Sequence, residues 1–421
     1  MTTEELNSAF ESVKARYEEF CLRDLNLNMM RGNPSREQMD LSEEMFLKVG
    51  VDSGFLNETA IDCRNYGGLD GLPELKKIFA AMMSVEPSQV IVGGNSSLNM
   101  MFDTISQFMI KGSYDGAVPW IKQDGIKFIC PSPGYDRHFK ICQYFNIQMV
   151  AVDMTPDGPD MDAVEELVKD ERVKGMWCVP KYSNPTGAVY SDEVIDRIAR
   201  LKPAAKDFRI MWDNAYCVHH LTDDEYVIPN LLELCEKYGN EDMVIKFAST
   251  SKITFPGAGV AAEAASARNV AFLKKRMSYQ TIGPDKLNQL RHARTFKSID
   301  DIHKHMRRHA EILRPKFGTV IARLEKELGG LGIAEWTNPK GGYFISLNVT
   351  DGCAKRVVEL CREAGVQLTA AGATYPYGFD PRDRNIRIAP TYPTLSELSD
   401  ASELLCIAVK YAALEKTLGE S

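Results

Sequence analysis

The sequence of 421 residues lacks a long apolar run, and it also lacks a basic leader. No stretch of about 18 consecutive apolar residues occurs, which excludes a membrane-spanning helix. The first twenty residues are acidic and amphipathic, without the basic and then apolar segments of a secretory signal. Positive charge is scarce too, since 50 Lys and Arg against 58 Asp and Glu give a net charge of −8. A negative surface repels phosphate backbones, so we expect neither a membrane nor nucleic acid as a partner.

Closely spaced cysteine pairs are also missing. None of the ten cysteines forms a C-x-x-C motif, and most lie in apolar surroundings such as MWCVP and LLCIAV. This pattern is typical of reduced core thiols in a cytoplasmic enzyme. Three histidines, His303, His305 and His309, lie in a predicted helix, but the segment KHMRRH is strongly basic and offers no third carboxylate ligand. We therefore expect a solvated helix face there and no metal site.

Short apolar runs alternate with helical patterns from residue 71 onward. The predicted strands cover 90–92, 126–130, 147–152, 175–179, 208–212 and 243–248. The predicted helices between them lie near 97–110, 135–144, 160–169 and 229–237, with a further one after Ser191. Buried strands separated by helices are typical of an α/β fold with a mostly parallel sheet between helices.

The pattern changes near residue 284. A helix over 284–296, a helical stretch over 299–327 interrupted at Pro315, and mixed strands and helices up to 417 indicate a smaller α+β domain. The predicted division is an N-terminal arm that forms part of the small domain (1–50), a large domain (51–298) and a small C-terminal domain (299–421).

Polar side chains follow two of the predicted strands, where open α/β sheets bind ligands. Asp213 comes directly after strand 208–212, and Tyr216 lies three residues later. Lys252 ends the segment Ser-Thr-Ser-Lys that follows strand 243–248. Taken alone, Asp213 could be a helix cap and Lys252 a solvated loop residue. A lysine in a crevice can instead have a lowered pKa and bond covalently to an aldehyde.

Two further segments follow strands. Gly93-Gly94-Asn95-Ser96-Ser97 lies between a strand and a helix, where backbone N–H groups and hydroxyls can hold an anion. Ser183-Asn184-Pro185-Thr186-Gly187 is a tight turn that offers the Asn184 amide. Each segment alone is common in loops. Together the four features meet the needs of a phosphorylated pyridine aldehyde: an anion cup, an acid for the ring nitrogen, donors for the ring oxygen and a lysine.

These motifs resemble the class I/II aminotransferases, the fold-type-I enzymes that use pyridoxal 5'-phosphate (PLP). The segment STSKITFPGAGVA at 249–261 is most similar to a bacterial aspartate-aminotransferase-like group. The resemblance implies that Lys252 holds PLP, that Asp213 pairs with the ring nitrogen, and that Tyr216 and Asn184 bond the ring oxygen. The residues implied to hold the phosphate are Asn95, Ser96, Ser97 and Ser249.

The resemblance also implies a substrate site and a homodimer. Tyr135, in PSPGYDRHF, would stack on the cofactor ring. Tyr66, in RNYGGLDGLPE, would reach the phosphate from the neighbouring subunit. Arg387, in NIRIAP, would clamp the substrate α-carboxylate, with Asn184 and with Gly32 of RGNP beside it.

The chain departs from the family at one position. The family carries an arginine on the phosphate seven or eight residues after the lysine, where this sequence has Gly259 and Val260. A second basic group is needed for the distal carboxylate of a dicarboxylic substrate. The sequence leaves its identity open among four residues: Arg31, Arg276, Lys286 and Arg291.

The activity implied is a ping-pong aminotransferase that uses aspartate or glutamate and 2-oxoglutarate. A carbon–sulfur β-lyase that uses PLP would share every cofactor residue and stays the main alternative. A PLP-binding regulator would need a DNA-binding helix-turn-helix, and the arm before residue 50 is too short and acidic for one. A serine acyl enzyme using Ser249-x-x-Lys252 needs this motif first and at a helix start, but here it comes after the Tyr182-Ser183-Asn184 element.

Overall fold

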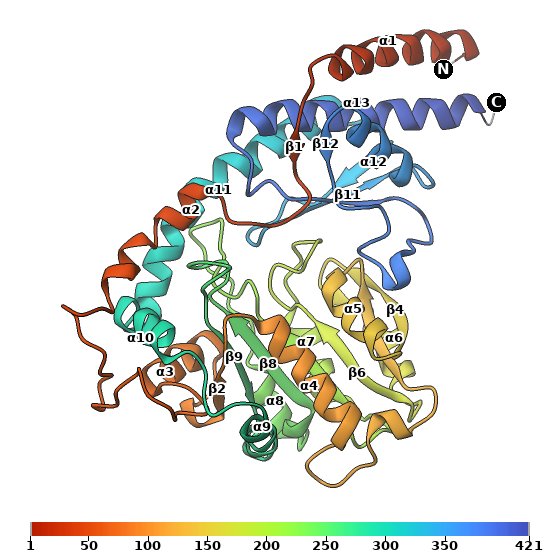
Figure 1. Cartoon of the computed structure of the whole chain (residues 1–421). Coiled ribbons are helices and arrows are strands. Elements are labelled where there is room, and N and C mark those ends of the chain that lie inside the picture. The colour runs from red at the N-terminus through yellow and green to blue at the C-terminus, as the bar shows by residue number, and fades with distance from the viewer. Residues whose placement is uncertain (1, 420–421) are drawn as a thin grey trace.

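The computed structural model describes residues 2–419 and contains an eight-stranded sheet in its larger part (Figure 1). The strand order is β2-β9-β8-β7-β6-β3-β4-β5. The strands are β2 (Val90–Val92), β3 (Lys127–Ser132), β4 (Gln148–Thr155), β5 (Gly158–Pro159), β6 (Val173–Cys178), β7 (Arg209–Asp213), β8 (Val244–Ser249) and β9 (Ala261–Ala265). The neighbours from β4 to β8 pair in parallel, whereas β9 is antiparallel to both β2 and β8. The predicted α/β fold with a mostly parallel sheet is confirmed.

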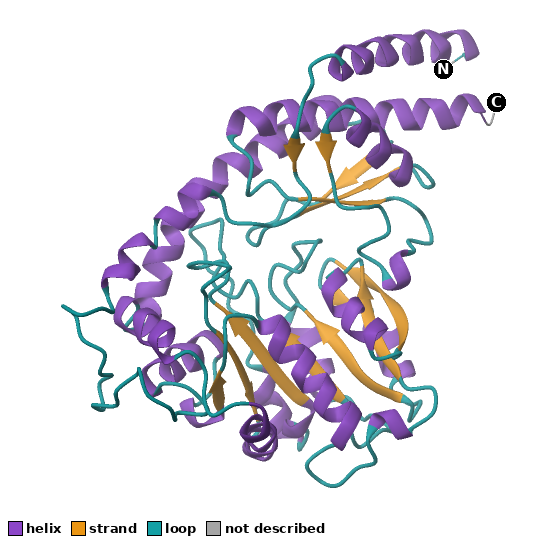
Figure 2. Cartoon of the chain, in the orientation of Figure 1, coloured by secondary structure: helices purple, strands orange, loops and turns teal. Residues whose placement is uncertain are grey.

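Helices cover both faces of this sheet (Figure 2), because successive strand residues bury opposite faces. Met211 packs with α4, α5 and α9, while Ile210 and Trp212 pack with α6, α7 and α8. These helices are α4 (Ser97–Lys111), α5 (Asp136–Tyr144), α6 (Met161–Leu167), α7 (Asp192–Ala199), α8 (Leu231–Tyr238) and α9 (Ala267–Gln280). Helix α3 (Pro73–Met83) packs on the β2 end of the sheet and begins with proline, whose missing N–H costs little in a first turn.

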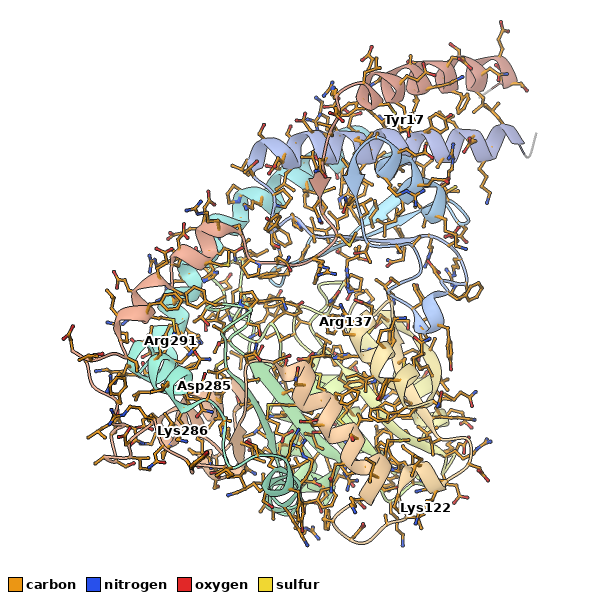
Figure 3. All side chains as sticks on the ribbon, viewed as in Figure 1. Tyr17, Lys122, Arg137, Asp285, Lys286 and Arg291 are labelled. Carbon is orange, nitrogen blue, oxygen red and sulfur yellow. The ribbon has the colours of Figure 1, made fainter. Side chains whose placement is uncertain are left out.

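The smaller part contains a three-stranded antiparallel sheet and a two-stranded parallel one. Its strands are β10 (Ala334–Trp336), β11 (Ile345–Val349), β13 (Asn385–Ile388), β1 (Leu27–Asn28) and β12 (Val366–Gln367). Its long helices are α1 (Thr3–Cys21), α11 (Ile299–Leu328), α12 (Ala354–Glu363) and α13 (Leu395–Gly419). Helices α1 and α13 lie side by side, and the hydroxyl of Tyr17, labelled in Figure 3, donates to the carbonyl of Leu360 at 3.0 Å. Helix α1 therefore packs on the C-terminal part of the chain.

The remaining helical elements connect these parts. They are α2 (Arg36–Asp40), α10 (Lys286–Thr295) and the 3-10 segments η1 (Glu43–Leu47), η2 (Pro87–Gln89), η3 (Trp120–Lys122), η4 (Glu241–Met243) and η5 (Pro376–Gly378). Helix α11 contacts both parts, since Ile302 packs with the β2 end of the large sheet and Leu324 with the core of the smaller part. The predicted domain limits, 1–50, 51–298 and 299–421, stay predictions. Among residues 2–419, no helix combines the length and apolar character needed to cross a bilayer.

The structure corrects one helix and adds two elements. The predicted interruption at Pro315 is wrong, because α11 continues through it. Pro315 is exposed, so the carbonyl that loses its bond to the missing N–H can be hydrated. The sequence analysis missed β9, whose sequence AAEAA has no β-branched residue, and α9, which is rich in polar residues.

Candidate active site

Lys252 lies in the turn that follows β8, between two aromatic rings. Its Nζ is 5.2 Å from the ring centroid of Tyr216 and 5.7 Å from that of Tyr343. Withdrawal from water lowers the pKa of Lys252, the nearby Asp213 opposes this effect, and the positive Arg387 adds to it. A lowered pKa leaves more of the amine unprotonated at neutral pH. A larger unprotonated fraction favours a role as a nucleophile and a base.

Asp213 is the last residue of β7, and the register pairs it with Phe247 of β8. The side chain is buried, and its Oδ2 atom lies 3.1 Å from Nε2 of His138. Its Oδ1 atom is buried without any hydrogen-bond partner. An unpartnered buried carboxylate oxygen is costly unless a ligand completes its bonding. This oxygen is available to a protonated ring nitrogen.

His138 is a site residue that the sequence analysis missed. It lies on the first turn of α5 and stacks on Trp177, with ring centroids 4.3 Å apart and planes 8° apart. This stack fixes the imidazole, and the imidazole in turn fixes Asp213. The sequence signal was present in PSPGYDRHF, three residues after Tyr135, but nothing local links it to Asp213.

Tyr135 and Tyr216 are far apart in the sequence, yet both phenols lie near enough to Asp213 for its charge to act on them. Burial and the charges of Asp213 and Asp136 raise the pKa of Tyr135 to about 12. Burial raises the pKa of Tyr216 well above its ordinary value. Both phenols therefore keep their protons at neutral pH. Tyr135 also packs edge-on against His138, with centroids 4.9 Å apart.

The predicted anion cup lies beside the loop that carries Lys252. Ser96 is the N-cap of α4 and makes no side-chain capping bond. The Asn95 side chain donates to the carbonyl of Gly257 at 3.4 Å, and Ser251 Oγ donates to the Asn95 carbonyl at 3.5 Å. Ser249 Oγ donates to Ser251 Oγ at 3.2 Å. The first N–H groups of a helix have no partner within it, so this corner suits a phosphate.

Arg387 on β13 reaches the site from the smaller part of the molecule. Its Nη1 atom donates to Oδ1 of Asn184 at 3.3 Å, and the guanidinium lies 4.9 Å from the ring centroid of Phe344. Phe344 also lies against Gly32, where a Cβ atom would be 2.6 Å from the ring atom Cζ. Only glycine permits this close approach, so Gly32 allows the N-terminal arm to pack behind the arginine.

Tyr66 is the one predicted cofactor residue that the structure leaves apart from the others. Its side chain is 81% exposed. The next residue, Gly67, accepts a hydrogen bond of 2.7 Å from Nζ of Lys286 at the start of α10. In this chain, Tyr66 therefore faces solvent.

The four basic residues left open by the sequence differ in their surroundings. Arg276 on α9 forms an ion pair of 3.0 Å with Asp103 of α4, so its charge is already paired, which argues against a substrate role. Lys286 is engaged with Gly67, and Arg31 is exposed.

Arg291 lies near the position where the family has its phosphate arginine. It donates through Nη2 to Oδ1 of Asn288, whose amide donates to the carbonyl of Gly259 at 2.7 Å. Its guanidinium covers Phe46, which in turn packs on Phe255 of the lysine loop. Arg291 is therefore the candidate to balance the charge of a phosphate near Gly259.

The expected solvated face at His305 and His309 is wrong, because both side chains are buried. His309 bonds Gln38 of α2 at 3.0 Å, and Gln38 donates to the hydroxyl of Tyr343 at 3.0 Å. The Tyr343 hydroxyl donates to the carbonyl of Lys252 at 3.4 Å. Burial lowers the pKa of His309 to about 3, so it is neutral. The two histidines therefore stabilise the lysine loop, His309 through Gln38 and His305 through its bond to the carbonyl of Ile253.

The residues present fit pyridoxal phosphate. The observation that tests the fit is the unpartnered buried Oδ1 of Asp213, which is the acceptor that a protonated pyridine nitrogen needs. An amine with a lowered pKa, a helix N-terminus with hydroxyls, and the side-chain amide of Asn184 supply the other groups. Within residues 2–419, no three histidine, cysteine or acidic side chains are grouped so that they could hold a metal ion.

The known proteins that this chain resembles over nearly its full length are described as aminotransferases. A family model described as "Aspartate amino-transferase" matches residues 1–421. A putative aminotransferase of Mycolicibacterium smegmatis is 47% identical over 420 residues, which cover 99% of this chain and 98% of that protein. An aspartate aminotransferase of Corynebacterium glutamicum is 46% identical over 96% of this chain and 94% of its own length.

Solved structures also match this chain over nearly its whole length. The crystal structure of an aspartate transaminase from Corynebacterium glutamicum superposes with a TM-score of 0.96 at 45% identity, over 99% of this chain and 98% of that chain. An α-aminoadipate aminotransferase from Thermus thermophilus, complexed with N-(5'-phosphopyridoxyl)-L-leucine, has a TM-score of 0.76 at 20% identity, over 94% and 95% of the two chains. The second likeness shows the fold alone.

Proposed function

The chain belongs to the aspartate aminotransferase family of PLP-dependent enzymes, and we propose that it exchanges amino groups between aspartate or glutamate and 2-oxoglutarate. The observation that carries the proposed site is the buried Oδ1 atom of Asp213, which has no hydrogen-bond partner and lies at the end of β7 beside the strand that leads to Lys252. The experiment that tests the function is to add single amino acids to the purified protein and follow the cofactor spectrum, and then to add 2-oxoglutarate.

The proposed mechanism gives each residue a defined task, and Lys252 has two. When bound, PLP supplies an electron sink for the pair left as the substrate Cα–H bond breaks. Asp213 keeps a negative charge at the ring nitrogen, and His138 holds that carboxylate in place. The Lys252 amine would hold the cofactor and, when free, would take up the Cα proton, because its lowered pKa increases the unprotonated fraction of the amine. Arg387 orients the substrate through the α-carboxylate.

We propose that Arg137 meets the distal carboxylate of a dicarboxylic substrate. Figure 3 shows this residue at the end of α5 that faces the smaller part of the molecule. It lies between Asp136, which contacts Arg387, and His138, which contacts Asp213. Its side chain is exposed, and its positive charge lowers the otherwise raised pKa of Tyr135, which places it near the proposed ring site. No motif in the sequence marks this residue.

Aspartate is expected to exceed alanine by roughly 10-fold to 150-fold in kcat/KM, because a charge-assisted bond to a second carboxylate contributes about 1.5–3 kcal/mol. Replacement Arg137→Gln should lower kcat/KM for aspartate by about tenfold. This value is at the low end of the expected preference, because water screens the charge of an exposed side chain. Alanine should be unaffected by the change. Steady-state rates for both amino acids with 2-oxoglutarate measure this.

The control variant is Arg276→Gln, which removes a basic residue paired with Asp103 and should leave the substrate preference unchanged. Equal rates with alanine and aspartate in the wild-type protein contradict the dicarboxylate proposal. The β-lyase alternative is favoured instead if pyruvate and ammonia form from a cysteine-type substrate without any 2-oxo acid acceptor.

We propose a homodimer with shared sites. An exposed apolar surface, named here the 46–66 surface, supports this; its residues are Phe46, Leu47, Val51, Leu56, Ile61 and Tyr66. Figure 1 shows this segment extending from the molecule beside α10. Contiguous exposed apolar side chains mark interaction surfaces. The surface adjoins the site, since Phe46 packs on Phe255 with ring centroids 5.1 Å apart.

Mixed dimers test whether Tyr66 acts across the interface. Tyr66→Phe and Lys252→Ala homodimers should each be impaired. Equal mixing of the two should restore about a quarter of wild-type activity, because half of the dimers are hybrids and each hybrid has one intact site. Activity after unfolding and refolding the mixture measures this. If hybrids form, as shown by tagged subunits, and no activity returns, Tyr66 does not act in trans.

We also propose a cytoplasmic location. All ten cysteines are free thiols, and most of them are buried. Free thiols persist in a reducing compartment, whereas secreted domains use cysteines in disulfides. Fractionation of cells that express the protein at natural level tests this location, and recovery of the protein outside the cytoplasmic fraction would contradict it.

A further inference from the structure

A carboxylate of the chain itself occupies the proposed substrate clamp. Nη1 of Arg387 donates to Oδ1 of Asp136 at 2.9 Å, and it also contacts Asn184. Nη2 of Arg387 donates to the hydroxyl of Thr369 at 3.2 Å. Asp136 is the only one of these three acceptors that carries a charge. The guanidinium is thus already paired with a carboxylate before a substrate carboxylate arrives.

This ion pair has a clear electrostatic reason. The Arg387 side chain is only 7% exposed, and its Nε atom is buried without a hydrogen-bond partner. A buried guanidinium without a counter-charge costs free energy. Asp136 is the ion-pair partner of Arg387 within the described residues 2–419. It therefore balances the clamp while the substrate is absent.

Asp136 is also the partner that can leave. Its side chain is 28% exposed, whereas Asn184 and Thr369 are buried. Asp136 is the first residue of α5, so rotation about its side-chain bonds can bring the carboxylate to water without moving the helix. A carboxylate in the first turn keeps a favourable interaction with the helix N-terminus in either position.

We propose that Asp136 is a built-in competitor of the substrate α-carboxylate and thereby a specificity-determining residue. A substrate must displace it from Arg387, so the apparent affinity is the intrinsic affinity multiplied by the fraction of molecules in which the clamp is free. A small anion that makes a single contact gains too little binding free energy to displace Asp136. An amino acid that is also held through other groups can do so. This inference rests on the proposed role of Arg387.

The test uses Asp136→Asn in the PLP-loaded enzyme, because asparagine keeps the size of the side chain and removes its charge. The probe is maleate, a dicarboxylate without an amino group, and its Kd is measured by calorimetry. We expect maleate to bind about 5-fold to 30-fold more tightly to the variant, the range of a partly buried ion pair. KM for the amino acid should fall similarly, with kcat changed by less than about twofold.

The matched control is Asp192→Asn, which removes an exposed carboxylate from the first turn of α7 and should leave the Kd of maleate unchanged. In an Arg387→Gln background, Asp136→Asn should not change the Kd of maleate. The four proteins form a double-mutant cycle, which isolates the interaction of Asp136 with Arg387. Unchanged or weaker maleate binding by Asp136→Asn overturns the proposal. An equal effect of Asp136→Asn in the Arg387→Gln background overturns it as well.

The binding measurement is independent of turnover. If the wild-type protein fails to transfer the amino group of aspartate, the proposed substrate is wrong, while maleate still reports whether Asp136 competes at Arg387. If turnover is normal and maleate affinity does not respond to Asp136→Asn, only the competitor role is wrong.

Discussion

Lys252→Ala is expected to lower kcat by about 10⁴-fold or more, because one group serves both as the covalent anchor and as the base, and general-base catalysis alone contributes about 10²- to 10⁴-fold. Lys252→Arg keeps the positive charge and should be equally inactive, since a guanidinium with a pKa above about 12 is neither a nucleophile nor a base at neutral pH. Steady-state rates with aspartate and 2-oxoglutarate give kcat for the two variants.

The location of the covalent bond is a separate measurement. Borohydride reduction followed by peptide mapping should place the pyridoxyl group on Lys252. Lys246 is the informative competitor, because it lies on β8, the strand that leads to Lys252, and burial lowers its pKa to about 7. Its amine is already engaged, donating to the carbonyl of Met83 at 2.7 Å and to Oδ1 of Asn230 at 2.6 Å. A label on Lys246 would contradict the assignment of Lys252.

Asp213→Ala is expected to lower kcat by about 10²- to 10³-fold, the usual cost of removing a preorganised charge from a buried site. Without the carboxylate, nothing keeps a proton on the ring nitrogen, so the ring withdraws electrons less well. The absorption spectrum of the bound cofactor should change as well, which a purely structural role would not predict. A nearly normal rate would refute the role of Asp213.

His138 provides a graded control for this prediction. His138→Ala removes the bond to Oδ2 but leaves the carboxylate charge, so a smaller loss of about 10-fold is expected, as for other residues that orient a catalytic group. A loss equal to that of Asp213→Ala would mean that the imidazole itself is the essential group. Thermal unfolding of both variants shows whether the fold is kept.

The sequence by itself determined the class of the fold and the core of the proposed site. Apolar strands alternate with helices along the chain, and this periodicity follows from local side-chain geometry. Lys252, Asp213 and Asn184 each follow a strand, and parallel strands bring their carboxyl ends to one edge. Their proximity could therefore be predicted from the order of the elements alone.

Only the tertiary structure decided which groups hold these residues. The bond between His138 and Asp213 joins residues 75 positions apart, and that between Asp136 and Arg387 joins residues 251 apart. No local pattern specifies such pairs, because they depend on how two parts of the chain pack. His305 and His309 looked solvated because their neighbours are basic, yet α11 turns them toward the lysine loop. Burial is a property of the packed molecule, so sequence composition could not determine it.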